Sequence, residues 1–115
     1  MESLKKNFQF RYVYQKGKSF ANRQLVMYII KNGTGENRLG ISVSKKVGKS
    51  VVRSRVTRLI RESYRSMEGE LKKGYHIVVI ARVACANADY WEIRHALEHL
   101  FRKHSFLTGK QQEKE

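Results

Sequence analysis

Hydrophobic and polar residues recur with two different periods along the chain, and each change of period marks a new element. Across residues 7–16 the apolar positions Phe10, Val13 and Tyr14 recur at helical spacing, and Gly17 follows them as a stop signal. We therefore expect a short helix over residues 7–16, with its apolar face turned to the rest of the protein.

Two segments further along are rich in β-branched and aromatic residues and predict strands. Residues 25–31 read LVMYIIK, and residues 38–44 alternate apolar with small or polar side chains. The segment between them, residues 32–37, reads NGTGEN, which is a strong turn signal. The pattern predicts that the two strands pair with each other as a hairpin.

The second half of the chain predicts a long helix, a buried strand and a last helix. The long helix covers residues 51–67, with Ser50 as its candidate N-cap, and the last helix covers residues 88 to about 104. The strand between them, residues 75–82, contains the run IVVI, which indicates an interior strand covered on both faces. The order α-β-β-α-β-α predicts an α/β (α+β) two-layer sandwich, in which helices pack on a mixed sheet.

The long helix has two unlike faces when its residues are placed at about 100° intervals. One face is largely apolar and is expected to pack on the sheet; it comprises Val52, Val56, Leu59, Ile60, Ser63 and Met67. The opposite face carries a row at i, i+4, i+7 and i+11, flanked by two more arginines; these residues are Ser54, Arg58, Arg61, Arg65, Arg53 and Arg55.

Positive charge is concentrated in this helix and in the loop before it. Residues 45–65 contain eight Lys and Arg residues and the single acid Glu62, a local net charge of +7 in a chain whose net charge is +14. Like charges one turn apart destabilise an isolated helix by a few tenths of a kcal/mol per pair. Because a plain solvated face would not offset this cost, we interpret the arginines as a surface for a polyanion, and a nucleic acid is the natural one.

DNA is the competing ligand for such a helix. Helices that read the major groove mix Asn, Gln, Ser and Arg at their base-contacting positions, and they usually belong to small helical domains. This helix is dominated by arginine and belongs to a sheet-based domain, so folded RNA fits better and we expect no DNA partner.

Length and composition indicate one small domain in a reducing compartment. The 115 residues fit a single domain over residues 1–115, in which residues 110–115 are expected to form a frayed tail. The lone Cys85 allows no internal disulfide and is expected to be a small buried hydrophobe. The first residues, MESLKKNF, lack the apolar stretch expected of a signal peptide, and no apolar run approaches the roughly 18 residues that a membrane span needs. We expect a cytoplasmic protein without a membrane partner.

The segment GISVSKKVGKSVVRSRVTRLIRE, residues 40–62, resembles the signature of the protein subunit of bacterial ribonuclease P. In that family a strand ending in G-L/I-S-V-S-K-K leads through a glycine turn to a helix with R-N-R and K/R-R-L-I-R. The segments ANRQLVMY, IVVIAR and LEHLFRK, residues 21–28, 77–82 and 97–103, are similar to the family too. Ser54 stands where the family usually has Asn, and Lys49 stands where many members have Asn.

The resemblance implies a fold and a division of labour. It implies a left-handed βαβ crossover, where sequence rules alone would predict a right-handed one. It implies that the RNA subunit holds Mg²⁺ and cleaves precursor tRNA, and that the protein is a non-catalytic subunit without independent activity. The catalytic RNA would be bound by Lys45, Lys46, Lys49, Arg53, Ser54, Arg55, Arg58, Arg61 and Arg65. The 5′ leader of precursor tRNA would be bound in a cleft by Phe10, Tyr14 and Tyr28.

Two other functions stay open on the residues alone. The first is a structural RNA-binding protein of the ribosomal type, with no role in cleavage. The second is a protein enzyme, because residues 95–99 read HALEH and formally match the H-x-x-E-H zinc pattern. We expect His95 and His99 to be solvated surface residues, since no convincing third ligand follows and the four histidines of the chain form no recognisable acid–base pair.

Overall fold

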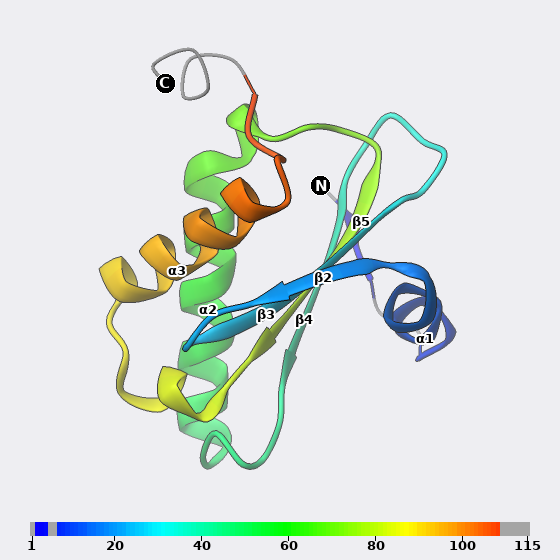
Figure 1. Ribbon diagram of the computed structural model, residues 1–115. Helices are drawn as coiled ribbons and strands as arrows, with labels where there is room; N and C mark the ends of the chain where they lie inside the picture. The colour runs from blue at the N-terminus through cyan, green and yellow to red at the C-terminus, as the bar shows by residue number, and fades with distance from the viewer. Residues whose placement is uncertain (1, 5–6, 109–115) are drawn as a thin grey trace.

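A computed structural model of the chain describes residues 2–4 and 7–108 (Figure 1). The tail expected at residues 110–115 lies outside the described residues. The helices and strands are, in chain order, β1 (Glu2–Ser3), α1 (Asn7–Lys16), β2 (Lys18–Ala21), β3 (Leu25–Lys31), β4 (Arg38–Val43), α2 (Ser50–Met67), β5 (Tyr75–Ala81) and α3 (Tyr90–Lys103). Short 3₁₀ helices, Glu68–Glu70 and Val83–Asn87, flank β5.

The expected α-β-β-α-β-α order is confirmed, and the structure adds two short strands to it. The strands form a mixed sheet in the order β1-β4-β5-β3-β2. β4 and β5 are parallel and are joined through α2, whereas β3 is antiparallel to both β5 and β2. The patterns did not reveal β1 or β2, because β1 has two residues and β2 is short and mostly exposed.

The predicted hairpin between residues 25–31 and 38–44 is wrong, because β5 lies between β3 and β4. The loop that joins β3 to β4 hydrogen-bonds to the start of β5 instead of closing a hairpin. The buried Asn37 side chain accepts a bond from the backbone N–H of Tyr75 (3.0 Å) and donates one to the carbonyl of Lys72 (2.7 Å). The backbone N–H of Asn32 likewise donates to the carbonyl of Gly74 (2.9 Å). The segment does form a turn, but its polar groups hydrogen-bond to the chain that enters β5, which lies between β3 and β4.

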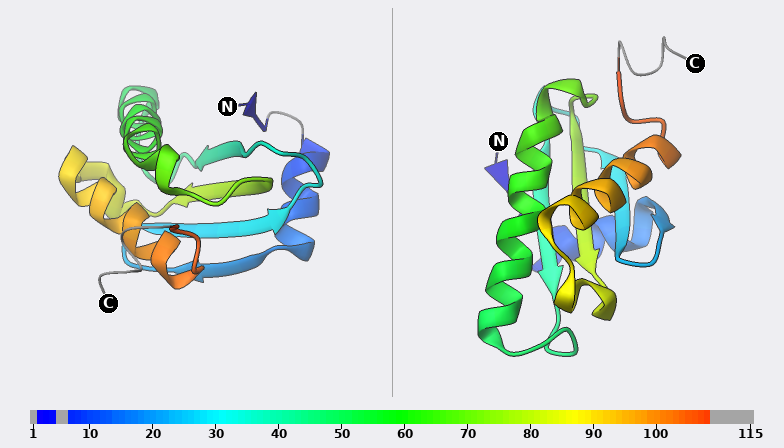
Figure 2. Two further views of the ribbon diagram at one scale, coloured as in Figure 1. Left: turned by 90° about the horizontal axis from the view of Figure 1, so that it is seen from above. Right: turned by 90° about the vertical axis from the view of Figure 1, so that its left-hand side faces the viewer.

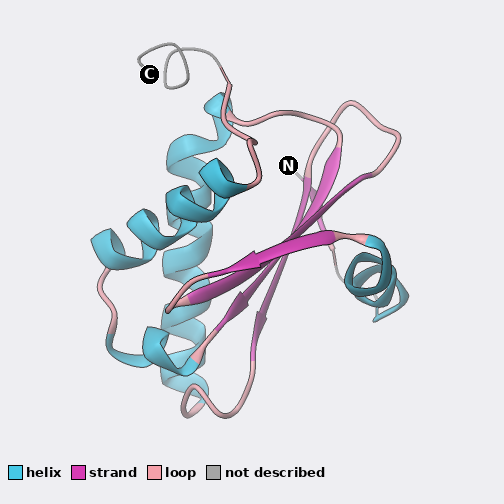
Figure 3. Ribbon diagram, viewed as in Figure 1, coloured by secondary structure: helices cyan, strands magenta, loops and turns pink. Residues whose placement is uncertain are grey.

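Helices cover both faces of the sheet. α2 and α3 pack against each other on one face, and α1 lies across the strands from them (Figures 1 and 3). In β5, Ile77 and Val79 belong to the main core under α2 and α3, while Val78 belongs to a smaller cluster under α1 with Val13 and Leu4. The prediction that the IVVI run is an interior strand covered on both faces is therefore confirmed.

The long helix buries the face that its pattern predicted. Its buried residues are Val56, Leu59, Ile60, Ser63, Tyr64 and Met67. The expected cap is wrong by one residue: Ser50 is the first helical residue, and Lys49 occupies the N-cap position without a side-chain capping bond. The lone Cys85 is fully buried, as expected, and burial raises the pKa of its thiol to about 11.

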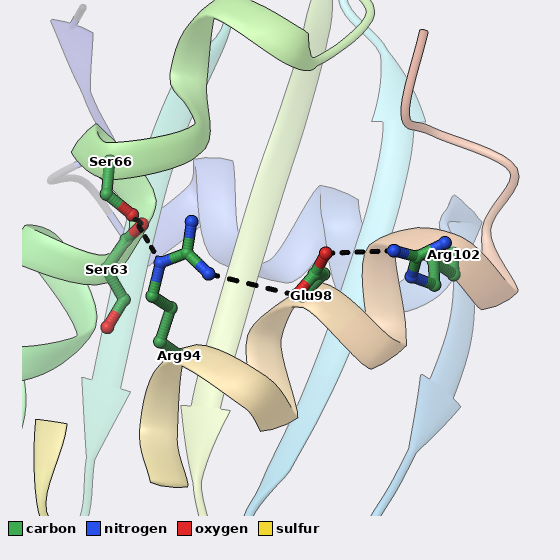
Figure 4. A network of polar contacts seen from close by, with 5 residues as sticks. All are labelled: Ser63, Ser66, Arg94, Glu98 and Arg102. Atoms are coloured by element: carbon green, nitrogen blue, oxygen red, sulfur yellow. Dashed lines mark hydrogen bonds and ion pairs between the residues drawn. The ribbon is translucent and has the colours of Figure 1, made fainter. Parts of the chain in front are cut away.

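Polar contacts connect α2 to α3 at the surface of the two-helix layer. Arg94 on α3 donates from Nε to the Ser66 hydroxyl on α2 (3.0 Å), and that hydroxyl donates to the carbonyl of Ser63 (2.6 Å) (Figure 4). Glu98 pairs with Arg94 (3.8 Å) and with Arg102 (3.0 Å) on its own helix. Seen from above, the two helices lie side by side (Figure 2). None of the helices in the described part of the chain is long and apolar enough to cross a membrane.

The aliphatic face of α2 is expected to carry much of the stability of the fold. Ile60→Ala should lower the free energy of unfolding by about 2–5 kcal/mol, because it leaves a cavity in a fully buried position. Val51→Ala on the same helix should change it by less than about 0.5 kcal/mol, because Val51 is exposed. Urea unfolding of the two variants measures both values, and equal losses would contradict this account of the buried face.

Candidate nucleic-acid interface

The face of α2 opposite the core presents the basic residues that the pattern predicted. Ser54, Arg58 and Arg65 are exposed, and Arg61 is partly exposed. Glu62 approaches Arg58 at 4.0 Å between Oε2 and Nε, but both side chains are more than half exposed. An exposed pair at this distance contributes little, so the guanidinium of Arg58 stays available to a ligand.

Two arginines near the start of α2 also hold the fold together. Arg53 donates from Nε to the carbonyl of Gly48 (3.1 Å), which ties the helix to the loop before it. Arg55 donates to the carbonyl of Ala88 (2.6 Å), just before α3. Both side chains are partly buried, so each can offer a ligand only its remaining N–H groups.

A concavity of about 480 Å³ lies between the basic face of α2 and β4. Its floor comes from β4, and its wall carries three guanidinium groups; the lining residues are Ile41, Val43, Ser50, Arg53, Ser54, Thr57, Arg58 and Arg61. Guanidinium groups match phosphate oxygens in bidentate geometry. The concavity is therefore suited to a phosphate backbone.

The loop from Lys45 to Lys49, here called the basic loop, positions its lysines in solvent. Lys45, Lys46 and Lys49 are all exposed, while Val47 between them is buried and anchors the loop. The N-cap residue Lys49 makes no side-chain capping bond, so no cap side chain occupies the first N–H groups of α2. A helix start of this kind attracts anions through its open N–H groups and dipole.

A second concavity, of about 420 Å³, lies between α1 and β4 on the other face of the sheet. It is lined by Asn7, Phe10, Arg11, Tyr14, Ile41 and Ser42. Phe10 packs so closely on β4 that a Cβ at Gly40 would lie 2.8 Å from its ring. We call this concavity the aromatic cleft.

The three aromatic residues predicted for a cleft lie together, but only Phe10 and Tyr14 line it. The Phe10 and Tyr14 ring centroids are 6.3 Å apart, and Tyr14 packs edge-on against Tyr28 at 5.1 Å. Tyr14 is 39% exposed and lines the cleft, whereas Tyr28 on β3 lies behind it and does not line it. Burial raises the pKa of the Tyr14 hydroxyl, and a hydrogen bond with the Ser42 side chain partly offsets this. The hydroxyl therefore stays protonated at neutral pH.

Sequence reasoning missed two polar residues of the aromatic cleft. Asn7 and Arg11 line it beside Phe10 and Tyr14. The four positions follow i, i+3, i+4 and i+7 spacing, so the helical pattern of residues 7–16 contained the signal. Ile41 lines both the aromatic cleft and the arginine-walled concavity, which places the two on either side of β4.

The histidines that matched a zinc pattern are exposed on α3. Glu98, the acid of the H-x-x-E-H match, pairs with Arg94 and Arg102. Among residues 2–4 and 7–108 no group of three His, Cys, Asp or Glu side chains could hold a metal ion. His76 and His104 lie on other parts of the fold, and burial lowers the pKa of both.

Comparisons with known proteins identify the family of the chain. A family model described as Ribonuclease P matches residues 1–105. The ribonuclease P protein component of Alkaliphilus metalliredigens is 55% identical over 105 residues, which cover 91% of this chain and 95% of that protein.

Solved structures show the same fold. The Staphylococcus aureus RNase P protein superposes with a TM-score of 0.86 at 37% identity, covering 94% of this chain and 99% of that one. A mutant of the S. aureus protein, described as having defective mRNA degradation activity, superposes with a TM-score of 0.85 at 39% identity, covering 91% and 89%. By sequence and by fold, the chain belongs to the ribonuclease P protein family.

Proposed function

We propose that this protein binds the RNA subunit of ribonuclease P with the basic face of α2 and the basic loop, and the 5′ leader of precursor tRNA with the aromatic cleft. The observation that carries the proposal is the exposed row Ser54, Arg58 and Arg65 on a helix whose other face is buried. The buried face fixes the direction of the guanidinium groups, so they meet a rigid RNA surface without a large loss of side-chain and backbone entropy.

The chemistry of cleavage belongs to the RNA in this proposal. Mg²⁺ would be held by the RNA subunit and the substrate, and it would stabilise the charge that develops as water attacks the phosphodiester. In this proposal the residues of the protein bind and orient the two RNAs. Phosphates that lie close together in a folded RNA repel one another, and the arginines would neutralise part of that charge. We propose that the protein acts in the cytoplasm.

The aromatic cleft suits a single strand of varied sequence. Every base has a π-face, so stacking on Tyr14 or Phe10 discriminates little between leaders and contributes roughly 1–3 kcal/mol per base. Arg11 at the rim supplies positive charge for the backbone of the strand. Stacking in this cleft would bring the leader to the protein while the arginines of α2 hold the catalytic RNA.

Two alternative functions make different use of the same surfaces. A ribosomal-type RNA-binding protein would use the arginines of α2 but would have no need of a leader cleft. A protein nuclease is the other alternative, since one S. aureus structure is described as a mutant with defective mRNA degradation activity. Hydrolysis by the protein alone needs an acid and a base within reach of one phosphate. Asp89 and Glu92 line one concavity with His95 and His99, but both acids are engaged in the capping box of α3.

Reconstitution separates these functions. Purified protein together with the RNA subunit should cleave precursor tRNA at low Mg²⁺, where neither component alone does. Cleavage of precursor or mRNA by the protein alone would favour the nuclease. Tight binding to ribosomal RNA without any effect on precursor processing would favour the ribosomal alternative.

Removal of one exposed arginine should weaken binding of the RNA subunit without changing its specificity. For Arg58→Ala and Arg61→Ala we expect the slope of log K against log salt to fall in magnitude by about 0.7–0.9 per lost phosphate contact. Lys31→Ala is the matched control, because Lys31 is an exposed cation at the end of β3, away from α2. Filter-binding titrations over a range of salt measure the slopes, and an unchanged slope in both arginine variants would refute a phosphate role.

Loss of the Tyr14 ring should weaken the binding only of substrates that carry a leader. Tyr14→Ala should weaken the binding of precursors with several leader nucleotides by roughly 1–3 kcal/mol and leave leaderless tRNA unaffected. Tyr14→Phe keeps the ring and should retain most of the affinity, and Tyr12→Ala should have no effect because Tyr12 does not line the cleft. Equal losses for precursor and leaderless tRNA would remove Tyr14 from the leader site.

A further inference from the structure

A third concavity, of about 590 Å³, lies away from the two surfaces assigned above. It is formed by the turn between β2 and β3 and by the N-terminal half of α3. Its lining includes Asn22, Arg23, Trp91, His95 and His99. The proposed function uses none of these residues.

The most unusual of them is Trp91, the only tryptophan of the chain. Its side chain is 63% exposed, although an indole is among the most favourable groups to bury. Tyr90 packs against it with ring centroids 5.0 Å apart and an interplanar angle of 80°. The neighbouring ring restrains the indole while most of its surface stays open, as in the aromatic anchors of binding surfaces.

Histidines extend the open surface of Trp91 along one side of α3. Trp91, His95 and His99 follow one another at i, i+4 and i+8, and all three line the concavity. The two histidines of the H-x-x-E-H match therefore lie in one row with an exposed indole, and a metal site would not require that indole.

Hydrogen bonds to Asn22 select one tautomer of the neutral His99 ring. The Asn22 Oδ1 atom accepts from the backbone N–H groups of Gln24 (3.2 Å) and Leu25 (2.9 Å), which sets the orientation of the amide. The Asn22 amide nitrogen lies 3.1 Å from His99 Nδ1 and also donates to the carbonyl of Ala96 (2.9 Å). Because an amide nitrogen only donates, Nδ1 of His99 accepts and Nε2 carries the hydrogen. His99 thus offers a hydrogen-bond donor on its outer side.

The lining of the concavity carries both signs of charge, with Arg23 as its cation and Asp89 and Glu92 as its acids. Arg23 is exposed and makes no ion pair with another described residue. The acids of the rim, Asp89 and Glu92, are engaged in the capping box of α3, where each accepts from the other's backbone N–H (2.8 and 2.9 Å). An open aromatic face beside a guanidinium and an imidazole N–H is the chemistry that holds a base and its phosphate.

We propose that this concavity binds an unpaired nucleotide of the same RNA that docks on α2, with the base on Trp91 and the phosphate at Arg23. The proposal rests on the proposed function, in which that RNA is the RNA subunit. The hydrogen bond from Arg55 on α2 to Ala88 joins the basic helix to the residue before the Asp89 cap, so one rigid ligand can reach both surfaces. The leader is a less suitable occupant, because its cleft lies under α1, across the sheet from α3 (Figure 1).

The single tryptophan makes the proposal directly measurable. Titration of the full chain with the RNA subunit, in the absence of precursor tRNA, should quench Trp91 fluorescence as the base stacks on the indole. Quenching should be retained in Tyr14→Ala, which removes the leader contact. An emission change that appears only when a leader-bearing precursor is added would overturn the proposal, as would one that depends on protein concentration alone and so reports a second copy of the chain.

Variants then test affinity. Trp91→Ala should weaken binding of the RNA subunit by roughly 5- to 150-fold, the range that one base stacked on an aromatic ring provides. Trp91→Phe should restore most of this loss, and Arg23→Ala should lower the salt slope by about 0.7–0.9. Tyr12→Ala is the matched control, because it removes an exposed aromatic ring on α1 and should change nothing.

The two proposals fail in distinguishable ways. If Arg58→Ala weakens the RNA subunit and Trp91→Ala does not, the nucleotide site is refuted and the proposed function stands. If neither variant weakens it, the proposed function itself is wrong. Thermal unfolding of each variant checks that the fold is intact, and we expect little change for Trp91→Ala because the side chain is mostly exposed.

Discussion

Burial of β5 on both of its faces is the constraint on which the rest of the structure depends. Ile77 and Val79 need cover on one side and Val78 on the other, so β5 takes the centre of the sheet and helices must pack on both faces. With β5 in the centre, β4 becomes its parallel neighbour, and a parallel pair needs a crossover, which is α2. The basic helix is therefore placed beside β4 by the hydrophobic demands of another strand.

α2 stabilises the fold with one side and, in the proposed function, binds RNA with the other. The aliphatic side is fully buried against the sheet and α3, and this burial offsets the repulsion among arginines on the outer side. Arg53 and Arg55 belong partly to each role, since each donates a hydrogen bond to the backbone of a neighbouring segment. A polyanion that neutralises the outer row relieves the repulsion that remains, which makes the bound state favourable for the helix as well as for its ligand.

The two helices on the main face form one supporting layer for the surfaces that we assign to RNA. Arg94 near the start of α3 donates to Ser66 in the last turn of α2 (Figure 4). Arg55 joins the first half of α2 to the segment before α3. α1 stands apart on the opposite face, where its aromatic residues pack on β3 and β4. In the proposed function, the protein would hold a folded RNA on one side and a single strand on the other without any movement between domains.

The sequence by itself determined the three α-helices and strands β3, β4 and β5, the two faces of α2 and the grouping of Phe10 with Tyr14, because each of these follows from periodicity within one element. It also indicated that β5 is interior, since a continuous apolar run such as IVVI is typical of a strand covered on both faces. Only the tertiary structure decided which strands pair. The NGTGEN turn predicted a hairpin, but Asn37 of this turn hydrogen-bonds to the chain that leads into β5. It alone showed that Ile41 lines two concavities and that Arg23 and Trp91 line a third one together. Periodicity reports which side of an element is buried, whereas partners distant in sequence are chosen by competition among all buried surfaces.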